Sequence, residues 1–327
     1  MLRHLAANVL TVLIVAMVAI SGVIYWGQSQ YTAPGPLAEP TVITVERGAR
    51  LDDVTETLLE AGAIGNDTIF RLGARYDGYD RRLRFGEYEV PAGASMREIL
   101  ALFASGRSIQ YFVTIPEGLT SWEAVQIIND TALLTGEITE IPPEGSLAPD
   151  TYSFERNATR ASIIDRMQAA QETILAEAWA NRQDGLPLDS PEELLILASI
   201  IEKETSVPEE RFDVAAVFVN RLNQGMRLQT DPTVIYGITL GQGPLGRGLR
   251  RSELDRATPY NTYQIDGLPP TPIANPGRAA IEATANPSEA PYIFFVADGT
   301  GGHAFSVTYA EHQRNVARWR EIERSRQ

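Results

Sequence analysis

Two glutamates close a segment that otherwise has the pattern of a buried helix, SPEELLILASIIEKETS at residues 190–206. Its apolar residues, from Leu194 to Ile201, recur every three or four positions, and Glu204 is the next member of that series. Glu202 lies roughly 200° around the helix from Glu204, on the flank of the apolar stripe. Burial against apolar side chains raises the pKa of a glutamic acid from about 4.3 and lets it act as a general acid near neutral pH. The spacing therefore predicts Glu204 as a proton donor; the alternative is an ordinary glutamate at a helix end, solvated or paired with an arginine.

The helix that carries these acids has a clear start in the sequence. Ser190 can cap it, Pro191 fits the first helical position, and Glu193 completes a capping box. We therefore expect the helix to begin at about residue 191.

The composition excludes several classes of protein. The 327 residues are enough for two compact domains, and the formal charge of −14 argues against nucleic acid as a partner. The absence of cysteine excludes disulfides and thiolate chemistry, and the three histidines, His4, His303 and His312, are too few and too scattered for a familiar zinc motif. We expect no metal site and no cofactor.

The N-terminal segment predicts a membrane anchor. Residues 5–26 are almost entirely apolar, and about twenty such residues cross a bilayer as a helix. Arg3 and His4 precede the segment and a long stretch without Lys or Arg follows it, so the positive-inside bias places the N-terminus in the cytoplasm. The alternative is a cleaved signal peptide, because Ala19 and Ser21 form a small-x-small site. We expect an uncleaved single-pass anchor, since the apolar run continues past that site.

Repeated local patterns follow the anchor. Residues 27–40 are rich in Gly, Pro and small polar residues and predict a linker. A short β-rich run, a glycine and an amphipathic helix then recur three times, with Gly48, Gly93 and Gly118 available for the positive φ of a tight turn. With a further helix at about 67–76, these units predict a small α/β subdomain.

A second region begins after a boundary rich in Pro and Gly. Helices are expected there at about 159–181 and 309–324, and a β-hairpin presents His303 in its glycine-rich turn. The predicted fold class is α+β. The expected division of the chain is an anchor with its N-terminus (1–26), a linker (27–40), an α/β subdomain with its connection (41–146) and a catalytic domain (147–327).

Three polar segments of this second region, 226–238, 258–277 and 298–306, show little helical periodicity and are expected to be loops that build a site. Their amides, carboxylate and aromatic rings are the groups that hydrogen-bond hydroxyls and stack on sugar rings. The alternative for each is a turn-capping Asn or Asp, or a tyrosine packed on the core. The candidate ligand contacts are Gln229, Asp231, Tyr236, Tyr260, Asn261, Tyr263, Asn275 and His303.

Four blocks together carry a family resemblance: ASIIEKET, NRLNQGMRLQTDPTVIYG, YNTYQIDGLPPTPIANPG and YIFFVADGTGGHAFS. In this order and spacing the chain resembles the endolytic murein transglycosylases of the MltG (YceG-like) family. The likeness extends over nearly the whole chain, and the first strand–glycine–helix unit resembles the start of a LysM module, which binds glycans; the alternative is a spacer or protein-docking surface. The family's catalytic acid matches Glu204. Residues 240–252 depart from the family pattern, which puts substrate contacts there in doubt.

The resemblance implies cleavage, without hydrolysis, of the β-1,4 bond between N-acetylmuramic acid and N-acetylglucosamine in nascent peptidoglycan. Glu204 would protonate the leaving oxygen and then, as a carboxylate, take the proton of the muramyl C6 hydroxyl, leaving a 1,6-anhydro end. Tyr236, Gln229 and Asn261 would position the reacting centre. Asp231 would either raise the pKa of Glu204 or cap the turn that follows it.

The resemblance also implies a place and partners. The chain would be a single-pass protein of the bacterial inner membrane, with a periplasmic catalytic domain that acts on glycan strands beside synthases of elongation or division. Two alternatives stay open: a lysozyme-like hydrolase in which Asp231 activates water, and a non-catalytic, membrane-tethered glycan-binding scaffold.

Overall fold

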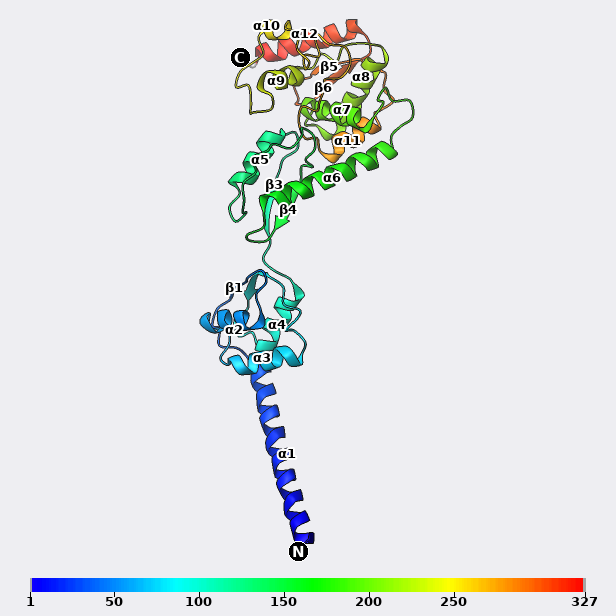
Figure 1. Ribbon diagram of the computed structural model, residues 1–327. Helices are drawn as coiled ribbons and strands as arrows, with labels where there is room; N and C mark the ends of the chain where they lie inside the picture. The colour runs from blue at the N-terminus through cyan, green and yellow to red at the C-terminus, as the bar shows by residue number, and fades with distance from the viewer. Residues whose placement is uncertain (1, 326–327) are drawn as a thin grey trace. The chain divides into compact units, whose positions relative to one another are not determined.

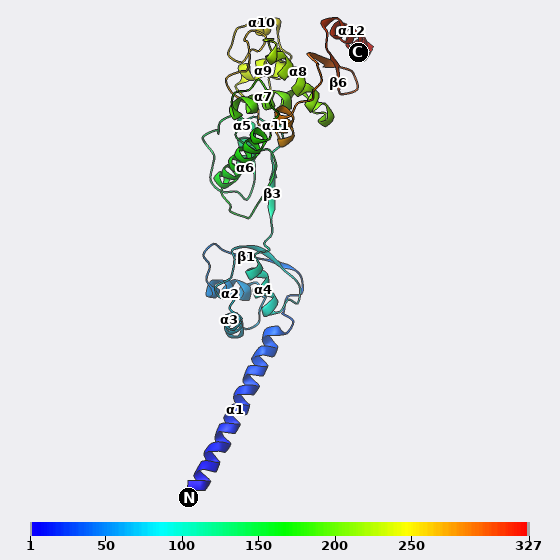
Figure 2. The same cartoon turned by 90° about the vertical axis from the view of Figure 1, so that its right-hand side faces the viewer.

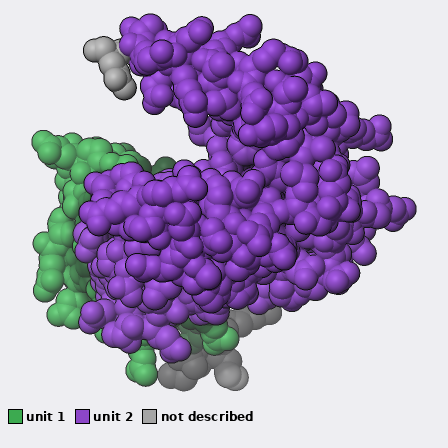
Figure 3. Space-filling model, turned by 90° about the horizontal axis from the view of Figure 1, so that it is seen from above, with its two compact units in different colours: residues 1–111, 153–156 green, residues 112–152, 157–327 purple. Residues whose placement is uncertain are grey.

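A computed structural model describes residues 2–325, with side chains from residue 8 onward. The side chains of Arg3 and His4, on which the expected orientation of the anchor depends, lie outside the described part. The chain forms two compact units, which Figure 3 colours separately. Residues 1–111 and 153–156 make the first unit, and residues 112–152 and 157–327 make the second. The predicted boundary between the α/β subdomain and the catalytic domain, at 146/147, is a different division and stays a prediction.

The first unit begins with a long apolar helix, α1 (Leu2–Thr32). Its segment Asn8–Thr32 is long and apolar enough to cross a membrane, and residues 8–26 of it are exposed. The predicted linker is wrong for residues 27–32, which continue α1. The physical reason is Tyr31, which is buried against Gly73 and donates a hydrogen bond from its hydroxyl to Asp77 Oδ2 at 3.1 Å. The last turn of α1 is therefore part of a packed core.

The α/β subdomain of the first unit has the predicted strand–glycine–helix order (Figure 1). Strands β1 (Thr41–Val45) and β2 (Gly86–Val90) pair antiparallel, and Gly48 and Gly93 have φ values of 82° and 67° in the turns that follow them. Tyr88, Phe70 and Phe103 are fully buried between this sheet and the helices. The helices are α2 (Leu51–Glu60), α3 (Asp67–Tyr76) and α4 (Met96–Ser105).

The third strand–glycine–helix unit contains β3 (Tyr111–Thr114), Gly118 with a φ of 76°, and α5 (Ser121–Asp130). Strand β3 pairs with β4 (Thr151–Phe154), and the division between the two compact units runs through this ribbon. All three predicted repeats are thus confirmed as local structure, and so is the additional helix at 67–76.

The second unit is helical around a central helix, α7 (Pro191–Glu204), which packs against α8 and α11. Leu194, Leu197 and Ile201 of its predicted stripe are fully buried. The other elements are α6 (Arg160–Ala180), the 3₁₀ turn η1 (Pro208–Glu210), α8 (Arg211–Asn223), α9 (Asp231–Thr239), α10 (Arg251–Leu254), α11 (Arg278–Ala285), the hairpin β5 (Phe294–Ala297) and β6 (His303–Ser306), and α12 (Tyr309–Ser325). The α+β class is confirmed.

Two local predictions in the second unit need correction. The capping box of α7 is half formed: Ser190 accepts the Glu193 N–H at 3.3 Å, but the Glu193 carboxylate accepts the N–H of Asp189 at 2.7 Å. Residues 231–239, expected to be a loop, form α9. This helix is short and contains β-branched residues and a glycine, so packing against α7 forms it rather than propensity or periodicity.

Candidate active site

Glu204 is the last residue of α7, and its side chain is partly buried. The hydroxyl of Thr230 donates a hydrogen bond to Glu204 Oε1. Burial raises the pKa of Glu204, and the negative charge of Asp231 adds to that rise, whereas the Thr230 hydrogen bond opposes it. None of the described residues hydrogen-bonds Oε2, which leaves that oxygen to carry and transfer a proton.

Thr230 is held in place by two other threonines. Its backbone N–H donates to Thr262 Oγ1 at 3.0 Å, and the Thr233 hydroxyl donates to the carbonyl of Thr230 at 2.8 Å. Thr233 and Thr262 also share a hydrogen bond between their hydroxyls at 2.8 Å. All three side chains are buried. The orientation of the Thr230 hydroxyl toward Glu204 is therefore fixed by a closed network that the sequence did not indicate.

Asp231 and Tyr263 form a second pair beside Glu204. The Tyr263 hydroxyl donates to Asp231 Oδ1 at 2.7 Å, and burial together with this bond raises the pKa of Tyr263. Asp231 is exposed and occupies the first turn of α9, where a negative charge is favoured by the helix dipole. The negative charge of Asp231 raises the pKa of Glu204, which is one of the roles considered for it.

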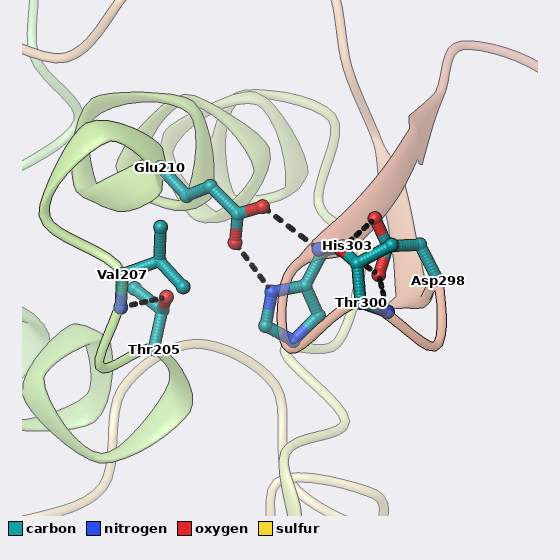
Figure 4. A network of polar contacts seen from close by, with 6 residues as sticks. All are labelled: Thr205, Val207, Glu210, Asp298, Thr300 and His303. Carbon is teal, nitrogen blue, oxygen red and sulfur yellow. Dashed lines mark hydrogen bonds and ion pairs between the residues drawn. The ribbon is translucent and has the colours of Figure 1, made fainter.

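His303 and Glu210 form a third pair, drawn in Figure 4. Glu210 Oε1 accepts the backbone N–H of His303 at 2.8 Å, and Glu210 Oε2 lies 2.7 Å from His303 Nδ1. Because a carboxylate only accepts, Nδ1 carries the proton and Nε2 is the unprotonated nitrogen of the neutral ring. The charge of His303, when protonated, lowers the pKa of Glu204, so the ring belongs to the same site.

The turn that joins α7 to η1 brings Glu204 and Glu210 into this region. Thr205 is buried and accepts the N–H of Val207 on its hydroxyl oxygen at 3.0 Å (Figure 4). Glu210 has no signal in the sequence, since it belongs to an ordinary charged run before α8.

Arg221 ties the loops around the site to α8. Its guanidinium is buried and donates to the carbonyl of Ile293 at 2.7 Å and to that of Leu228 at 2.6 Å. Burial lowers the pKa of Arg221, while the charge of Glu204 opposes that change. Arg221 thus holds Ile293, just before the hairpin, and Leu228, just before Gln229.

Gln229 has an unusual backbone conformation next to Thr230. Its φ is 51°, which is uncommon for a residue other than glycine, and its N–H donates to the carbonyl of Thr262 at 3.1 Å. Its side chain is exposed. A left-handed residue that presents an exposed amide beside a buried carboxyl is a strained arrangement of the kind found at functional sites.

Tyr236 and Tyr260 lie against each other, with ring centroids 5.0 Å apart. The Tyr260 hydroxyl shares a hydrogen bond with Thr271 at 2.8 Å, and Tyr236 lies close to the partly buried carboxyl of Glu144. Burial raises the pKa of Tyr236. Both residues are partly buried.

The two asparagines predicted to contact ligand are instead buried and bonded within the protein. Asn261 donates to the carbonyls of Glu253, Leu254 and Arg256, and its own side-chain oxygen accepts the N–H of Tyr263 at 3.0 Å. The side-chain oxygen of Asn275 accepts the N–H of Leu147 at 2.9 Å, and its amide donates to the carbonyl of Leu119 at 3.0 Å. The structure gives no support to ligand contact by Asn261 or Asn275, because their polar atoms are already satisfied.

Glu202, which helical spacing places on the flank of the apolar stripe, also has a buried side chain. Its side chain is 7% exposed, accepts the N–H of Gly277 at 3.0 Å and lies 4.0 Å from Arg211. Burial raises the pKa of Glu202 as well. What separates the two acids is their surroundings: Glu202 faces α11 and a guanidinium, whereas Glu204 faces Thr230, Asp231 and His303. In the part of the chain that the structure describes, no three His, Asp or Glu side chains are grouped to hold a metal ion.

Comparison with known proteins bears on this site. A model of the YceG-like family matches residues 43–318. The chain is 28% identical over 327 residues to the endolytic murein transglycosylase of Bacillus subtilis (strain 168), covering 90% of this chain and 89% of that protein. It is also 28% identical over 324 residues to the endolytic murein transglycosylase of Streptococcus pneumoniae serotype 2 (strain D39 / NCTC 7466), covering 84% of this chain.

The chain spans 57% of the length of that pneumococcal relative. A crystal structure described as a YceG-like protein from Listeria monocytogenes has a TM-score of 0.51 and 28% identity, covering 84% of this chain and 99% of that one.

Proposed function

Since the chain belongs to the YceG-like family, we propose that it is a peptidoglycan lytic transglycosylase. It cleaves the β-1,4 bond between N-acetylmuramic acid and N-acetylglucosamine inside a glycan strand. The names of the Bacillus and Streptococcus relatives support this activity. The observation that carries the proposal is the carboxyl of Glu204 at the end of α7, which is partly buried, has a raised pKa and accepts a hydrogen bond from Thr230.

In the proposed reaction Glu204 first donates its proton to the glycosidic oxygen, and the bond to C1 of the muramyl residue breaks. The C6 hydroxyl of the same residue then forms a bond to C1, and the Glu204 carboxylate takes the hydroxyl proton. The enzyme returns to its starting state and the strand ends in a 1,6-anhydro ring. One carboxyl is enough because the substrate supplies the nucleophile, whereas ordinary glycosidases require two.

The groups around Glu204 have distinct roles in this proposal. Asp231 raises the pKa of Glu204, and Tyr263 keeps Asp231 in place. Gln229 and His303 hydrogen-bond the saccharide, and the aromatic rings of Tyr236 and Tyr260 limit water at the reacting carbon. Asn261 and Asn275 shape the loops and do not touch the ligand.

The chain's surroundings follow from α1. We propose that α1 is an uncleaved single-pass anchor with its N-terminus in the cytoplasm and both compact units outside, in the periplasm. Nascent strands and the synthases that make them are then within reach. The first unit's LysM-like order supports glycan binding by that unit.

The products of the purified full chain test this function. Isolated glycan strands are digested and their ends analysed by mass spectrometry. A lytic transglycosylase gives 1,6-anhydro-muramyl ends. A lysozyme-like enzyme gives reducing muramic acid ends, and a scaffold binds strands without shortening them; either result overturns the proposal.

A further inference from the structure

Helix α3 exposes an apolar face that the fold of the first unit does not cover. Phe70 and Ala74 point into the core and are fully buried. Leu72 and Tyr76, four residues apart, share the other face and are 62% and 82% exposed; Ile69, three residues before Leu72, is partly buried at the edge of that face, where it also packs against the core. Large apolar side chains that follow one helix face and remain exposed mark a contact surface.

This face lies beside the C-terminal end of α1. Figures 1 and 2 show α3 crossing that end of the anchor helix. A hollow of about 630 Å³ separates the two helices, lined from α1 by Val23, Ile24 and Trp26, and from α3 by Ile69, Leu72 and Tyr76. The arrangement is fixed by Tyr31, because a Cβ atom at Gly73 would lie 2.3 Å from its ring.

The level of α3 along α1 matches a membrane interface. An α-helix rises about 1.5 Å per residue, so roughly 20 residues cross a hydrocarbon core of about 30 Å, and headgroups add about 5–7 Å on each side. The apolar run begins at Leu5, so a span of about twenty residues leaves the hydrocarbon at about residue 24. Tyr25 and Trp26, both exposed, then lie where aromatic side chains gather in membrane proteins.

We propose that α3 lies in the outer interface of the bilayer that α1 crosses, with Ile69, Leu72 and Tyr76 in contact with lipid. The proposal rests on α1 being a membrane span. Lipid is the partner that covers this face, because the face is continuous with the aromatic end of the α1 span. In addition, Arg75 is exposed in the last turn of α3 and can reach phosphate headgroups. The first unit is then seated on the membrane rather than suspended from a flexible linker.

The natural absence of cysteine permits a direct test. Leu72→Cys, Met17→Cys and Val42→Cys variants of the full chain are each labelled with an environment-sensitive fluorophore and placed in phospholipid nanodiscs. Met17 lies within α1, and Val42 is 53% exposed on β1 of the same unit. We expect labels at 17 and 72, but not at 42, to shift their emission to shorter wavelength and to be quenched by lipids that carry a quencher.

The outcomes are separable. If the label at 17 is quenched and the label at 72 is not, α1 still crosses the membrane, but α3 does not lie in the interface and the proposal is overturned. A shifted but unquenched label at 72 means that protein, not lipid, covers the face, which also overturns it. If the label at 17 is not quenched, α1 does not cross the membrane, and both the proposed anchor and the proposed position of α3 are wrong.

A second, independent inference concerns Glu210 and His303. The Glu210 carboxylate sits so close to the backbone of the hairpin that a Cβ atom at Gly302 would lie 2.4 Å from its Oε1. Both oxygens are occupied by donors of one residue, the N–H and Nδ1 of His303. The carboxylates that interact with this ring are those of Glu210, Asp298 and Glu204.

We infer that Glu210 is a positioning residue that fixes the tautomer of His303, so that Nε2 accepts a hydrogen bond from a saccharide hydroxyl beside Glu204. This inference rests on the proposed function. None of the described residues hydrogen-bonds Nε2, and Phe295 packs against the ring edge-on with centroids 5.2 Å apart, which limits its rotation. Fixing a histidine tautomer through a carboxylate on Nδ1 is a general way to define what Nε2 can do.

Glu210→Gln tests this role with the matched control Glu209→Gln, whose parent side chain is exposed. The backbone N–H of His303 can only donate, so it takes the amide oxygen and leaves the NH₂ group facing Nδ1. We expect ¹⁵N NMR of the full chain to show the proton moving from Nδ1 to Nε2. The catalytic efficiency on glycan strands should fall about tenfold, by loss of one hydrogen bond, with unchanged thermal stability.

An unchanged tautomer in Glu210→Gln overturns the positioning role, and so does a reversed tautomer with full activity. The NMR result does not depend on turnover, so its failure is distinct from failure of the proposed function, in which the wild-type chain would form no anhydro ends.

Discussion

At the scale of single residues, the acidity of Glu204 depends on a balance of neighbours. Burial and the charge of Asp231 favour its protonated form, while the Thr230 hydrogen bond and the positive charges of His303 and Arg221 favour the carboxylate. Helical spacing was enough to predict where Glu204 lies. It could not identify Thr230, Glu210 or Arg221, because their roles arise only from contacts between segments distant in the sequence. Asn261 was misjudged for the same reason: a loop amide has the same sequence signature whether it binds a ligand or its own backbone.

The raised pKa of Glu204 predicts a pH-dependent cost in stability. Between the unfolded pKa of about 4.3 and the higher folded pKa, the native state holds more protons than the unfolded state, so the free energy of unfolding falls as pH rises. Glu204→Gln lacks this loss. Denaturant unfolding from pH 4 to pH 8 should therefore show the variant gaining stability relative to wild type. A constant difference across that range would contradict burial of the acid; the exposed Glu209→Gln serves as control.

The Thr230 hydroxyl lowers the pKa of Glu204, so its removal should raise that pKa further. We expect Thr230→Val to shift the alkaline limb of the pH–activity profile to higher pH and to reduce activity several-fold, because the acid is less well oriented. Thr230→Ser keeps the donor and should resemble wild type. If the limb stays in place in Thr230→Val, the hydrogen bond does not tune the acid.

At the scale of elements, the three strand–glycine–helix units and α7 were predictable, since each has a strong local pattern. Helix α9 was not, because its short buried side, Thr233 and Val234, is defined only by the surface it packs on. The linker predicted at residues 27–40 was misjudged, because its polar, Pro-rich composition gives no sign of the backbone hydrogen bonds that it makes. The N–H of Gly35 donates to the carbonyl of Gly93 at 3.0 Å, and the N–H of Gly93 donates to the carbonyl of Leu37 at 2.9 Å.

This pairing predicts a position that tolerates no side chain. A Cβ atom at Gly35 would lie 2.2 Å from the carbonyl oxygen of Ala94, a backbone atom that cannot rotate away. Gly35→Ala should destabilise the first unit by about 1–3 kcal/mol. Hydrogen-exchange mass spectrometry should show faster exchange in that unit alone. Gly65→Ala, with no atom within 4 Å of its added Cβ, is the control, and equal behaviour of the two variants would refute the close approach.

At the scale of the whole molecule, one apolar helix in the described part of the chain is long enough to cross a membrane, and the net charge of −14 argues against binding to an anionic surface by charge alone. The same N-terminal pattern fits an anchor and a cleaved signal, which is why sequence left both open.

The intact mass of the membrane-bound protein distinguishes them. We expect the mass of the full chain, because Tyr31 belongs to α1 and packs on Gly73, which makes the helix part of the folded first unit. A protein that begins after residue 21 would show that most of α1 is cleaved off and that only its last turns, which carry Tyr31, remain.

The central claim is that Glu204, and not its neighbour Glu202, transfers the proton that breaks the glycosidic bond. The most direct measurement is the rate of formation of 1,6-anhydro-muramyl ends by Glu204→Gln and Glu202→Gln, with folding verified by circular dichroism. The account predicts a fall of at least about 100-fold for Glu204→Gln, and far less for Glu202→Gln. Equal losses in the two variants, or substantial turnover by Glu204→Gln, would contradict it.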